Sequence, residues 1–472
     1  MHPAANLAPL NDVHARLNPT VPALQRRPGS LEDLRAALLQ ARRRGLAVSI
    51  AGGRHAMGGQ QFLHGGLALD MRGLNRILDF DQERGQITVE AGATWPDLMR
   101  GYLSQQAGKT PQWGIRQKQT GADSLTIGGA IAANIHGRGL ACPPFSADVE
   151  SLQLLCADGA LVTCSRQQNP ELFRLVVGGY GLFGVVVSAR LRMVRRQKVE
   201  RVVELLALPE LMRAFDERIG AGYTYGDFQF ATDPGSPGFL NDGVFSCYRP
   251  VDDTRPMAPN QLRLHQADWR RLLYLAHVNK RRAFVEFTDF YLRSSGQLYW
   301  NDTHQLNIYL DDYHGQLDAH LGAHVPGTEM ITELYVPRDR LADFMATVRE
   351  DFRRHQVDFI YGTIRLIRKD EDAFLAWAKD DYACVIFNLH VDHHANGLAR
   401  AQTDFQRLID RAIEFGGSYF LTYHRFARRD QLLRCYPQMP EFLRRKRNLD
   451  PDERFSSDWY RHQRALLSDL LE

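Results

Sequence analysis

The stretch Val48-Ser-Ile-Ala-Gly-Gly-Arg-His-Ala-Met-Gly-Gly-Gln60 decides how the rest of the chain is interpreted. It predicts a short strand over 48–51 that runs directly into a glycine-rich loop with one histidine. Glycine lets the backbone take positive φ and lets a flat or anionic ligand approach the peptide N–H groups closely. A second such loop, Thr126-Ile-Gly-Gly-Ala-Ile-Ala-Ala-Asn-Ile-His-Gly-Arg-Gly139, follows in the same half of the chain. The two loops together indicate one large cofactor that is held from two sides.

The composition is that of a soluble globular protein, with 44% hydrophobic and 24% charged residues. At 472 residues the chain is too long for one ordinary core, so two domains are expected. A net charge of +3 gives no support to nucleic-acid binding, which needs a concentrated basic face. The six cysteines show no CxxC spacing, which argues against zinc ribbons and disulfides and favours a reducing compartment. We expect a cytoplasmic protein without an integral membrane segment.

The coarse pattern of elements is α+β. Ser30 is a candidate N-cap, with Asp33 in the N3 place of a capping box, and Thr94 is a second candidate. The other elements expected in the first half are a helix at 169–176 and strands at 67–71, 85–93, 148–157, 160–165 and 184–195. We expect the strands 67–71 and 85–93 to be joined by a charged hairpin, and Asp158-Gly159 to turn between the next two. After about residue 206 the strands look longer and antiparallel, with helices near 264–279, 338–354, 370–378 and 398–414.

One motif points in a misleading direction. Gly179-Tyr-Gly-Leu-Phe-Gly184 has the spacing G-x-G-x-x-G of a dinucleotide fingerprint, which needs a strand before it and a helix after it. Here the motif follows a predicted helix and leads into a predicted strand, so we reject a Rossmann site.

The ordered series 48–60, 119–139 and 148–192 resembles the FAD-binding domain of the vanillyl-alcohol oxidase/p-cresol methylhydroxylase (PCMH-type) superfamily. The matching pieces include the strand and GGRH loop, Asp70 at a strand end, Gly-Gly-Ala, Asn-Ile-His-Gly and Gly-Gly-Tyr-Gly-Leu-Phe-Gly-Val-Val. The resemblance implies a two-subdomain FAD-binding domain over 1–205, an α+β cap (substrate) domain with an antiparallel sheet over 206–415, and a C-terminal segment, 416–472, that returns to the FAD domain. The FAD contacts that it implies are Gly52, Gly53, Arg54, His55, Ala56, Thr120, Gly121, Ser124, Ile127, Gly128, Gly129, Ala132, Asn134 and Val186.

The resemblance also implies a role for His55. In the lactone and alditol oxidases of this superfamily, the histidine of the corresponding loop is linked covalently to the flavin 8α carbon. A neutral imidazole nitrogen can make such a bond by attacking an electrophilic flavin. The alternative is that His55 only hydrogen-bonds FAD, and here Arg54 and Ala56 replace the usual Gly and Ser neighbours. His136 is interpreted as a structural loop histidine.

The C-terminal segment resembles the tail of decaprenylphosphoryl-ribose oxidase and the sugar-lactone oxidases through Gly416-Gly-Ser-Tyr-Phe-Leu, Cys435-Tyr-Pro-Gln and Leu449–Asp458. In those relatives the tail completes the active site, which places Phe455 and Ser457 near the cofactor, and a lysine follows the Gly-Gly strand. This chain has no lysine there, so Tyr423, His424 or Arg425 must supply the donor.

Three further stretches supply candidate catalytic and substrate residues. Thr363-Ile-Arg365 resembles the Glu-x-Arg pair of alditol oxidases, and Arg365 is expected to contact substrate or flavin unless it pairs with Glu371 or Asp372. His390 shares a strand face with Asn388 and Asp392 and is a candidate general base or part of a solvated polar face. No metal is expected from His390 with His393 and His394, because a strand brings only alternate residues together. The polar-aromatic run 297–305 offers four residues for a sugar-like ligand or for cap packing, namely Tyr299, Trp300, His304 and Gln305.

These features predict an FAD-dependent oxidoreductase that oxidises a CH–OH group of a polyol, sugar or sugar-lactone-like substrate by hydride transfer to flavin N5. His390 or Tyr423 is the first choice for the group that takes the hydroxyl proton, and O₂ or another acceptor receives the electrons. Two alternatives stay open. One is a flavin-dependent C=C reductase that uses NAD(P)H, and the other is a noncatalytic flavin- or sugar-binding protein.

Overall fold

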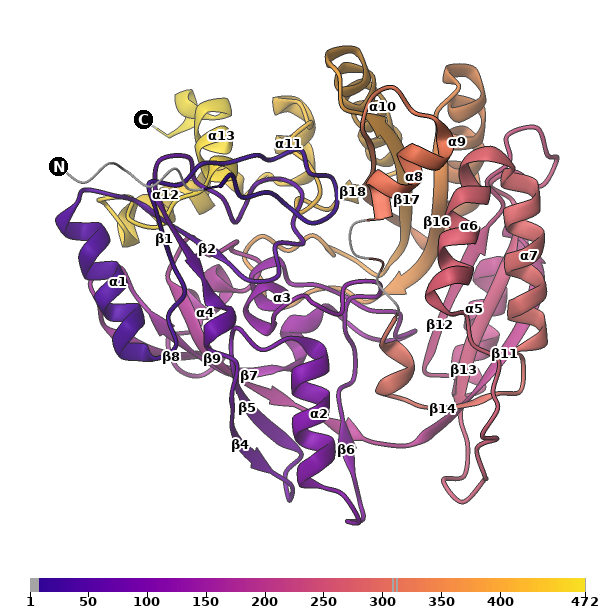
Figure 1. Ribbon diagram of the computed structural model, residues 1–472, viewed down its shortest axis with the longest axis horizontal. Coiled ribbons are helices and arrows are strands. Elements are labelled where there is room, and N and C mark those ends of the chain that lie inside the picture. The colour runs from indigo at the N-terminus through magenta and orange to yellow at the C-terminus, as the bar shows by residue number, and fades with distance from the viewer. Residues whose placement is uncertain (1–7, 308–309, 311–312, 472) are drawn as a thin grey trace.

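The computed structural model describes residues 8–307, 310 and 313–471, and the first seven residues of the predicted N-terminal arm lie outside this range. The fold is α+β, as the sequence predicts. In Figure 1 the N-terminal elements form the left part of the molecule and a large sheet with its helices forms the right part. The C-terminal helices lie back over the N-terminal part, beside the predicted glycine loops.

The N-terminal part contains two sheets. A parallel sheet has the order β1-β3-β2, and an antiparallel sheet has the order β4-β5-β9-β7-β8. The strands are β1 (Leu24–Arg26), β2 (Val48–Ala51), β3 (Leu67–Asp70), β4 (Ile77–Asp81), β5 (Gln86–Glu90), β7 (Val149–Leu155), β8 (Leu161–Ser165) and β9 (Val185–Arg192), with the short pair β6 (Trp113–Gly114) and β10 (Val194–Arg195) leading to the cap. The helices are α1 (Leu31–Arg43), α2 (Trp95–Gln105), α3 (Ile127–Ala133) and α4 (Pro170–Val176).

Local signals explain several of these elements. Thr94 caps α2 in a full capping box with Asp97. Ser30 caps α1, but Asp33 accepts from the N–H of Gly29 and does not close the predicted box. The Asp158-Gly159 hairpin between β7 and β8 is confirmed.

The predicted hairpin between 67–71 and 85–93 is wrong. β3 is the buried central strand of the parallel sheet, whereas β5 pairs with β4 in the other sheet. All four residues of β3 are buried, which suits a central parallel strand and not an alternating hairpin strand.

The cap is built on an eight-stranded antiparallel sheet with the order β14-β11-β13-β12-β16-β17-β15-β18. α9 and α10 contact β15 and pack Phe352 against Phe387, while α6 contacts β16 and α7 contacts β11 and β13. The strands are β11 (Lys198–Ala207), β12 (Tyr225–Phe230), β13 (Asp242–Pro250), β14 (Leu298–Trp300), β15 (Gly327–Pro337), β16 (Phe359–Ile367), β17 (Tyr382–Asp392) and β18 (Ser418–Tyr419). The helices are α5 (Leu211–Gly220), α6 (Gln266–Val278), α7 (Lys280–Arg293), α8 (Tyr313–Leu321), α9 (Leu341–His355) and α10 (Ala395–Glu414).

The helix predicted over 370–378 is wrong. The Asp370 carboxylate accepts the N–H groups of Asp372 and Ala373, and this local capping holds the backbone in a turn. Trp377 from the same stretch is buried and donates its ring N–H to the carbonyl of Asn134. The segment therefore joins the cap to α3. The other three helices of this part are confirmed as α6, α9 and α10.

The C-terminal segment contains α11 (Arg429–Cys435), α12 (Met439–Leu449) and α13 (Asp458–Leu466). Just before α13 the chain runs beside β2, where the N–H of Val48 donates to Arg454 and the N–H of Ser456 donates to Val48. Strands of the large sheet come from both sides of residues 205 and 415, because β11 begins at Lys198 and β18 lies at Ser418–Tyr419. The division into 1–205, 206–415 and 416–472 stays a proposal.

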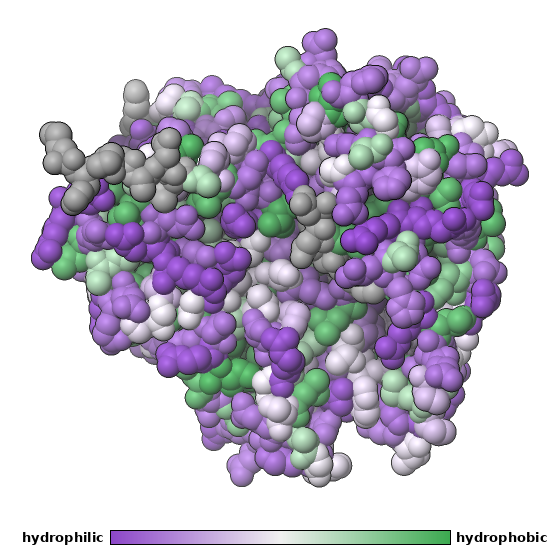
Figure 2. Space-filling view, viewed as in Figure 1, coloured by the Kyte–Doolittle hydropathy of each residue, from purple (hydrophilic) through white to green (hydrophobic). Residues whose placement is uncertain are grey.

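None of the described helices is both long enough and apolar enough to cross a membrane. Figure 2 shows one face of the molecule, on which hydrophilic residues predominate and apolar residues form small separate groups. Scattered apolar residues of this kind are normal on a protein surface.

Candidate active site

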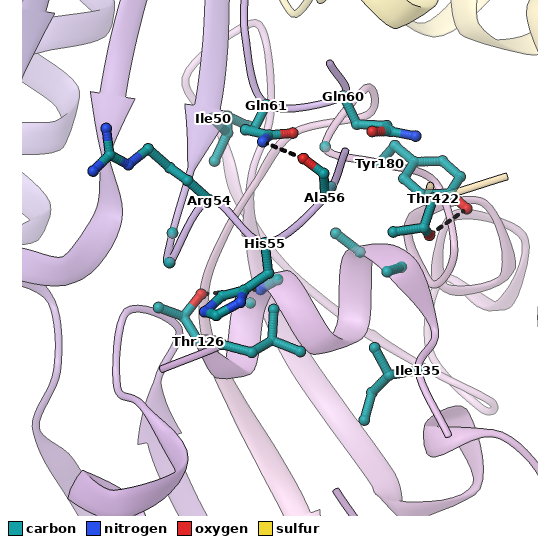
Figure 3. Close-up of a pocket in the computed structure, with 18 of the residues that line it drawn as sticks. Ile50, Arg54, His55, Ala56, Gln60, Gln61, Thr126, Ile135, Tyr180 and Thr422 are labelled. Carbon is teal, nitrogen blue, oxygen red and sulfur yellow. Dashed lines mark hydrogen bonds between the residues drawn. The ribbon is translucent and has the colours of Figure 1, made fainter. Parts of the chain in front are cut away.

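A cavity lies where the two glycine loops meet. A Cβ atom on Gly52 would lie 2.1 Å from Oγ1 of Thr126, and one on Gly53 would lie 2.2 Å from the carbonyl oxygen of Ser124. Only glycine allows this contact between the loops, so the sequence fixes their packing at these two positions. Figure 3 shows His55 beside Thr126 at the start of α3, with the Arg54 side chain extending away from it.

Most of the predicted FAD contacts line this cavity. They are Gly52, Gly53, Arg54, His55, Ala56, Thr120, Gly121, Gly128, Gly129, Ala132 and Val186. Three others are not part of the lining: Ile127 is in the core, the Asn134 side chain bonds Asp370 and Ser146, and the backbone carbonyl of Ser124 lies against Gly53 of the first loop. Phe455 and Ser457 do not line it either, since Phe455 packs in the core beside Val48 and Ser457 caps α13.

Several lining residues escaped the sequence reasoning. Gln60 and Gln61 follow the first loop, and in Figure 3 Gln61 donates to the carbonyl of Ala56. On the far side of the cavity, Tyr180 and Thr422 share a hydrogen bond of 3.2 Å. Tyr180 has φ +52 within the rejected G-x-G-x-x-G motif, so that turn forms part of the wall although it is not a Rossmann fingerprint.

The lining suits FAD. Seven of its described residues are glycine, which exposes peptide N–H groups, and none of its described residues is Asp or Glu, which would repel a pyrophosphate. Two buried polar atoms of the lining, Oε1 of Gln61 and Oε1 of Gln119, form no hydrogen bond within the described chain. A buried polar atom needs a partner, so these two oxygens fit contacts to the polar groups of FAD.

His55 contacts a second histidine from the N-terminal arm. Nε2 of His14 lies 2.9 Å from Nδ1 of His55, and both residues line the cavity. Burial, then the neighbouring His14, lowers the pKa of His55 to about 3. Burial also lowers the pKa of His14 to about 4. Both rings are therefore neutral at neutral pH, which leaves His55 able to act as a nucleophile.

A second cavity adjoins the first and lies between the cap sheet and the helices α6 and α7. The two cavities share His14, Gln119, Thr120, Gly121, Ile331 and Tyr423. On the helix side the wall is apolar, with Trp269, Leu272, Leu273, Phe284 and Phe287. On the sheet side it carries the polar side chains of Gln229, Thr363, Arg365 and Asn388 among apolar ones. A molecule in the second cavity would reach the first one at the shared residues.

Arg365 lines the second cavity and is only 4% exposed. Its Nε and Nη1 atoms form no hydrogen bond within the described chain. The ion pair with Glu371 or Asp372 that the sequence left open does not form, because Lys369 pairs with Glu371 and Arg166 pairs with Asp372. Tyr361 and Thr363, predicted on the same strand face, also line this cavity, together with Ile360 and Gly362. Arg365 thus offers two buried N–H groups to an oxygen ligand.

Tyr423 belongs to the lining shared by both cavities and donates a hydrogen bond of 3.2 Å to Oε2 of Glu333. Glu333 is fully buried, and its Oε1 lies 2.6 Å from Nε2 of His136 and accepts from Tyr335. Burial alone would raise the pKa of Glu333, but His136, Tyr335 and Arg365 outweigh it and lower this pKa. Burial, then Glu333, raises the pKa of Tyr423 well above its usual range. A neutral tyrosine therefore bonds an ionised carboxylate.

Glu333 was missed by the sequence reasoning, and His136 was given only a structural role. A carboxylate within the apolar strand 330–336 is itself a signal, because a buried charge requires partners from other elements.

The other candidates line neither cavity within the described chain. His390 lies against Glu329 and Asp392, and His424 stacks on Phe405 and bonds Thr332. The four residues predicted for a sugar-like ligand make other contacts: Tyr299 stacks on Arg201, Trp300 on Arg196, His304 bonds Arg138 and Gln305 bonds Lys118.

Known proteins match this chain. Residues 22–165 match the family model described as FAD binding domain. The chain is 32% identical to an uncharacterized oxidoreductase, ORF5 in the fasciation locus of Rhodococcoides fascians, over 41% of this chain and 43% of that protein. It is 25% identical to decaprenylphosphoryl-β-D-ribose oxidase of Mycolicibacterium smegmatis over 85% of this chain and 86% of that protein. It is 28% identical to L-gulonolactone oxidase of Bos taurus over 43% of this chain and 45% of that protein.

Two of these three matches thus span less than half of the relative. The family model covers both glycine loops, which form much of the wall of the cofactor cavity, and also the β7–β8 hairpin, which does not line it within the described chain. The cofactor is FAD, and residues 22–165 form an FAD-binding domain of the PCMH type, as in the vanillyl-alcohol oxidase/p-cresol methylhydroxylase flavoproteins.

Proposed function

We propose that the protein oxidises a CH–OH group of an alcohol held in the second cavity and passes the electrons to O₂ or another acceptor. FAD, when bound, supplies the two-electron acceptor for this chemistry. The observation that carries the proposal is the position of Tyr423, whose side chain lines both cavities and bonds Glu333.

The residues divide the work as follows. Arg365 binds an oxygen of the substrate through its two buried N–H groups and stabilises negative charge that develops there. Tyr423 accepts a hydrogen bond from the hydroxyl that is oxidised. Its own proton moves toward Oε2 of Glu333, and His136 holds that carboxylate in place. We therefore assign proton transfer to Tyr423 with Glu333. We do not assign a catalytic role to His390 or His424, because neither lines the first or the second cavity.

The walls of the second cavity narrow the substrate class. A free polyol would leave the aromatic and aliphatic side chains of α6 and α7 against polar groups, which forfeits about 25 cal/mol per Å² of apolar area. An alcohol with a polar, hydroxyl-bearing end and an apolar remainder satisfies both walls. Sugar-lactone-like compounds fit the polar wall, and compounds with an added apolar group fit both.

The test is anaerobic reduction of the bound flavin, which is measured as the loss of its visible absorbance. The panel pairs free polyols and sugar lactones with derivatives that carry an alkyl or prenyl group on the same head. We expect the derivatives to bleach the flavin faster, without added nucleotide. Bleaching by NAD(P)H alone would support the reductase alternative, and no bleaching by any compound would support a flavin-binding protein without catalysis.

Covalent attachment of FAD through His55 is part of the proposal. The neutral state of His55 and its place in the cavity lining support it. His14 is then a positioning residue, because its Nε2 orients Nδ1 of His55.

A further inference from the structure

Three histidines surround one buried carboxylate at the wall of the second cavity. Glu329 on β15 has a side chain that is 7% exposed, and it lies between His277 of α6, His390 of β17 and His314 of α8. Oε1 of Glu329 is 3.1 Å from Nε2 of His277 and 3.3 Å from Nδ1 of His390. These three atoms all lie within 4.8 Å of one another.

The spacing matches a metal site. In a tetrahedral zinc site with bonds of about 2.0–2.1 Å, neighbouring ligand atoms are about 3.3 Å apart. Two imidazole nitrogens and one carboxylate oxygen are also a ligand set that zinc uses in proteins, with a further position left open. The two measured separations from Oε1 of Glu329, 3.1 and 3.3 Å, agree with that edge length.

The hydrogen bonding does not account for His277. Its side chain is only 6% exposed, and Nε2 forms no hydrogen bond within the described chain although the carboxylate oxygen is 3.1 Å away. The in-plane direction of this nitrogen therefore misses the oxygen. A buried nitrogen without a partner is costly, and a metal ion near the carboxylate would supply the partner.

A second carboxylate supports His390 from behind. Oδ1 of Asp392 lies 3.6 Å from Nε2 of His390, while the other ring nitrogen faces Glu329. Metal-binding histidines typically direct their second nitrogen at a carboxylate, which fixes the ring and its tautomer. The second cluster of this kind, His136 with Glu333 and Cys384, differs because Nε2 of His136 already forms a hydrogen bond with Oε1 of Glu333, whereas Nε2 of His277 forms none within the described chain.

We propose that His277, Glu329 and His390 bind a divalent metal ion of the zinc class. The ion ties α6 to β15 and β17 and fixes one end of the second cavity, whose wall includes Glu329. From the sequence we expected no metal at His390, His393 and His394; the ligands proposed here come from three elements that are far apart along the chain, so no local spacing indicates them. The proposal does not depend on which substrate the enzyme takes.

The test uses the full-length flavoprotein without a polyhistidine tag, stripped with a chelator and then loaded with ZnCl₂. After gel filtration we expect the wild type to retain one zinc ion per chain by elemental analysis, and the Co²⁺ form to show visible bands outside the flavin spectrum. His277→Ala should weaken zinc binding by more than the roughly 10–100-fold that is typical of losing a supporting carboxylate, and Asp392→Asn should weaken it by about that amount. His320→Ala, on the exposed side of α8, is the matched control and should bind like the wild type.

Wild-type protein that retains no zinc, or a His277→Ala variant that binds as tightly as the wild type, would overturn the proposal. Circular dichroism and flavin content check the folding of each variant. If His277→Ala does not fold, Asp392→Asn decides, because that side chain is half exposed, and unchanged affinity in it would also overturn the proposal.

Discussion

Replacement of Tyr423 by Phe tests the proton path of the proposed reaction. Tyr423 and Tyr335 are both buried, and both donate a hydrogen bond to Glu333, but only Tyr423 lines the two cavities. Tyr335→Phe is therefore a matched control. It removes the same kind of bond from the same carboxylate without touching the site where substrate is expected.

The magnitudes follow from these contacts. A hydrogen bond to a charged group contributes about 1.5–3 kcal/mol, so both variants should lose about that much free energy of unfolding. In Tyr423→Phe the hydroxyl that receives the substrate proton is also absent, and loss of general acid–base catalysis costs about 10²–10⁴ in rate. That range corresponds to about 2.7–5.4 kcal/mol of activation free energy.

The assay is anaerobic stopped-flow reduction of the flavin by the alcohol that the wild type oxidises fastest, with urea unfolding measured in parallel. We expect Tyr335→Phe to be destabilised but to keep most of its reduction rate, and Tyr423→Phe to lose both. The reasoning is refuted if Tyr423→Phe reduces its flavin as fast as the wild type. It is equally refuted if the two variants lose rate to the same extent, because Tyr423 would then act only through the fold.

Three more predictions follow from other parts of the structure. Arg365→Met should lower kcat/KM by about 10–100-fold, since one charge-assisted bond to the substrate contributes about 1.5–3 kcal/mol. The urea midpoint of unfolding should stay unchanged or rise, because two unpaired polar nitrogens leave the interior. A falling midpoint with unchanged kcat/KM would contradict this. Acid precipitation should leave yellow wild-type protein and colourless His55→Ala, with partial flavin retention in His14→Ala; free flavin from the wild type would exclude the covalent bond. Burial lowers the pKa of His424 to about 3, so the unfolded chain binds an extra proton below its ordinary pKa of 6.5 and stability falls as pH drops. His424→Phe removes that loss, so between pH 7.5 and 5 its unfolding free energy should fall by about 2 kcal/mol less than that of the wild type, and equal pH profiles would contradict the assignment.

The cofactor cavity could be predicted because its geometry depends on glycine. Gly52 and Gly53 leave no room for a Cβ atom, and this requirement is readable without knowing which segment lies opposite. His14 shows the limit of that reasoning. It reaches His55 from an irregular arm whose path is set by tertiary contacts, such as the bond between Nδ2 of Asn18 and the carbonyl of Met57.

Strand periodicity also predicted part of the second cavity and left part of it open. It predicted that Tyr361, Thr363 and Arg365 share one face of β16, and all three line the second cavity, but it could not say which face of the cap sheet meets the flavin domain. For Tyr299 and Trp300 the polar-aromatic composition suggested a ligand, whereas Arg201 of β11 and Arg196, just before β11, stack on the two rings. Composition therefore identifies a polar surface, and only the sheet order assigns it to a cavity.

This chain has no lysine after the Gly-Gly strand, and residues at the junction of the two cavities can take over the functions that a lysine would have. A lysine can supply both a positive charge and a transferable proton from one atom. Here the positive charge comes from Arg365, and the proposed proton transfer runs through Tyr423 and Glu333. Because Arg365 helps to keep Glu333 ionised, the two functions are coupled through that carboxylate, although Arg365 lies on β16 and Tyr423 lies in the segment after β18. Restoring a lysine at position 423 would place a second cation beside Arg365 and Glu333, so Tyr423→Lys should not recover the activity that Tyr423→Phe loses.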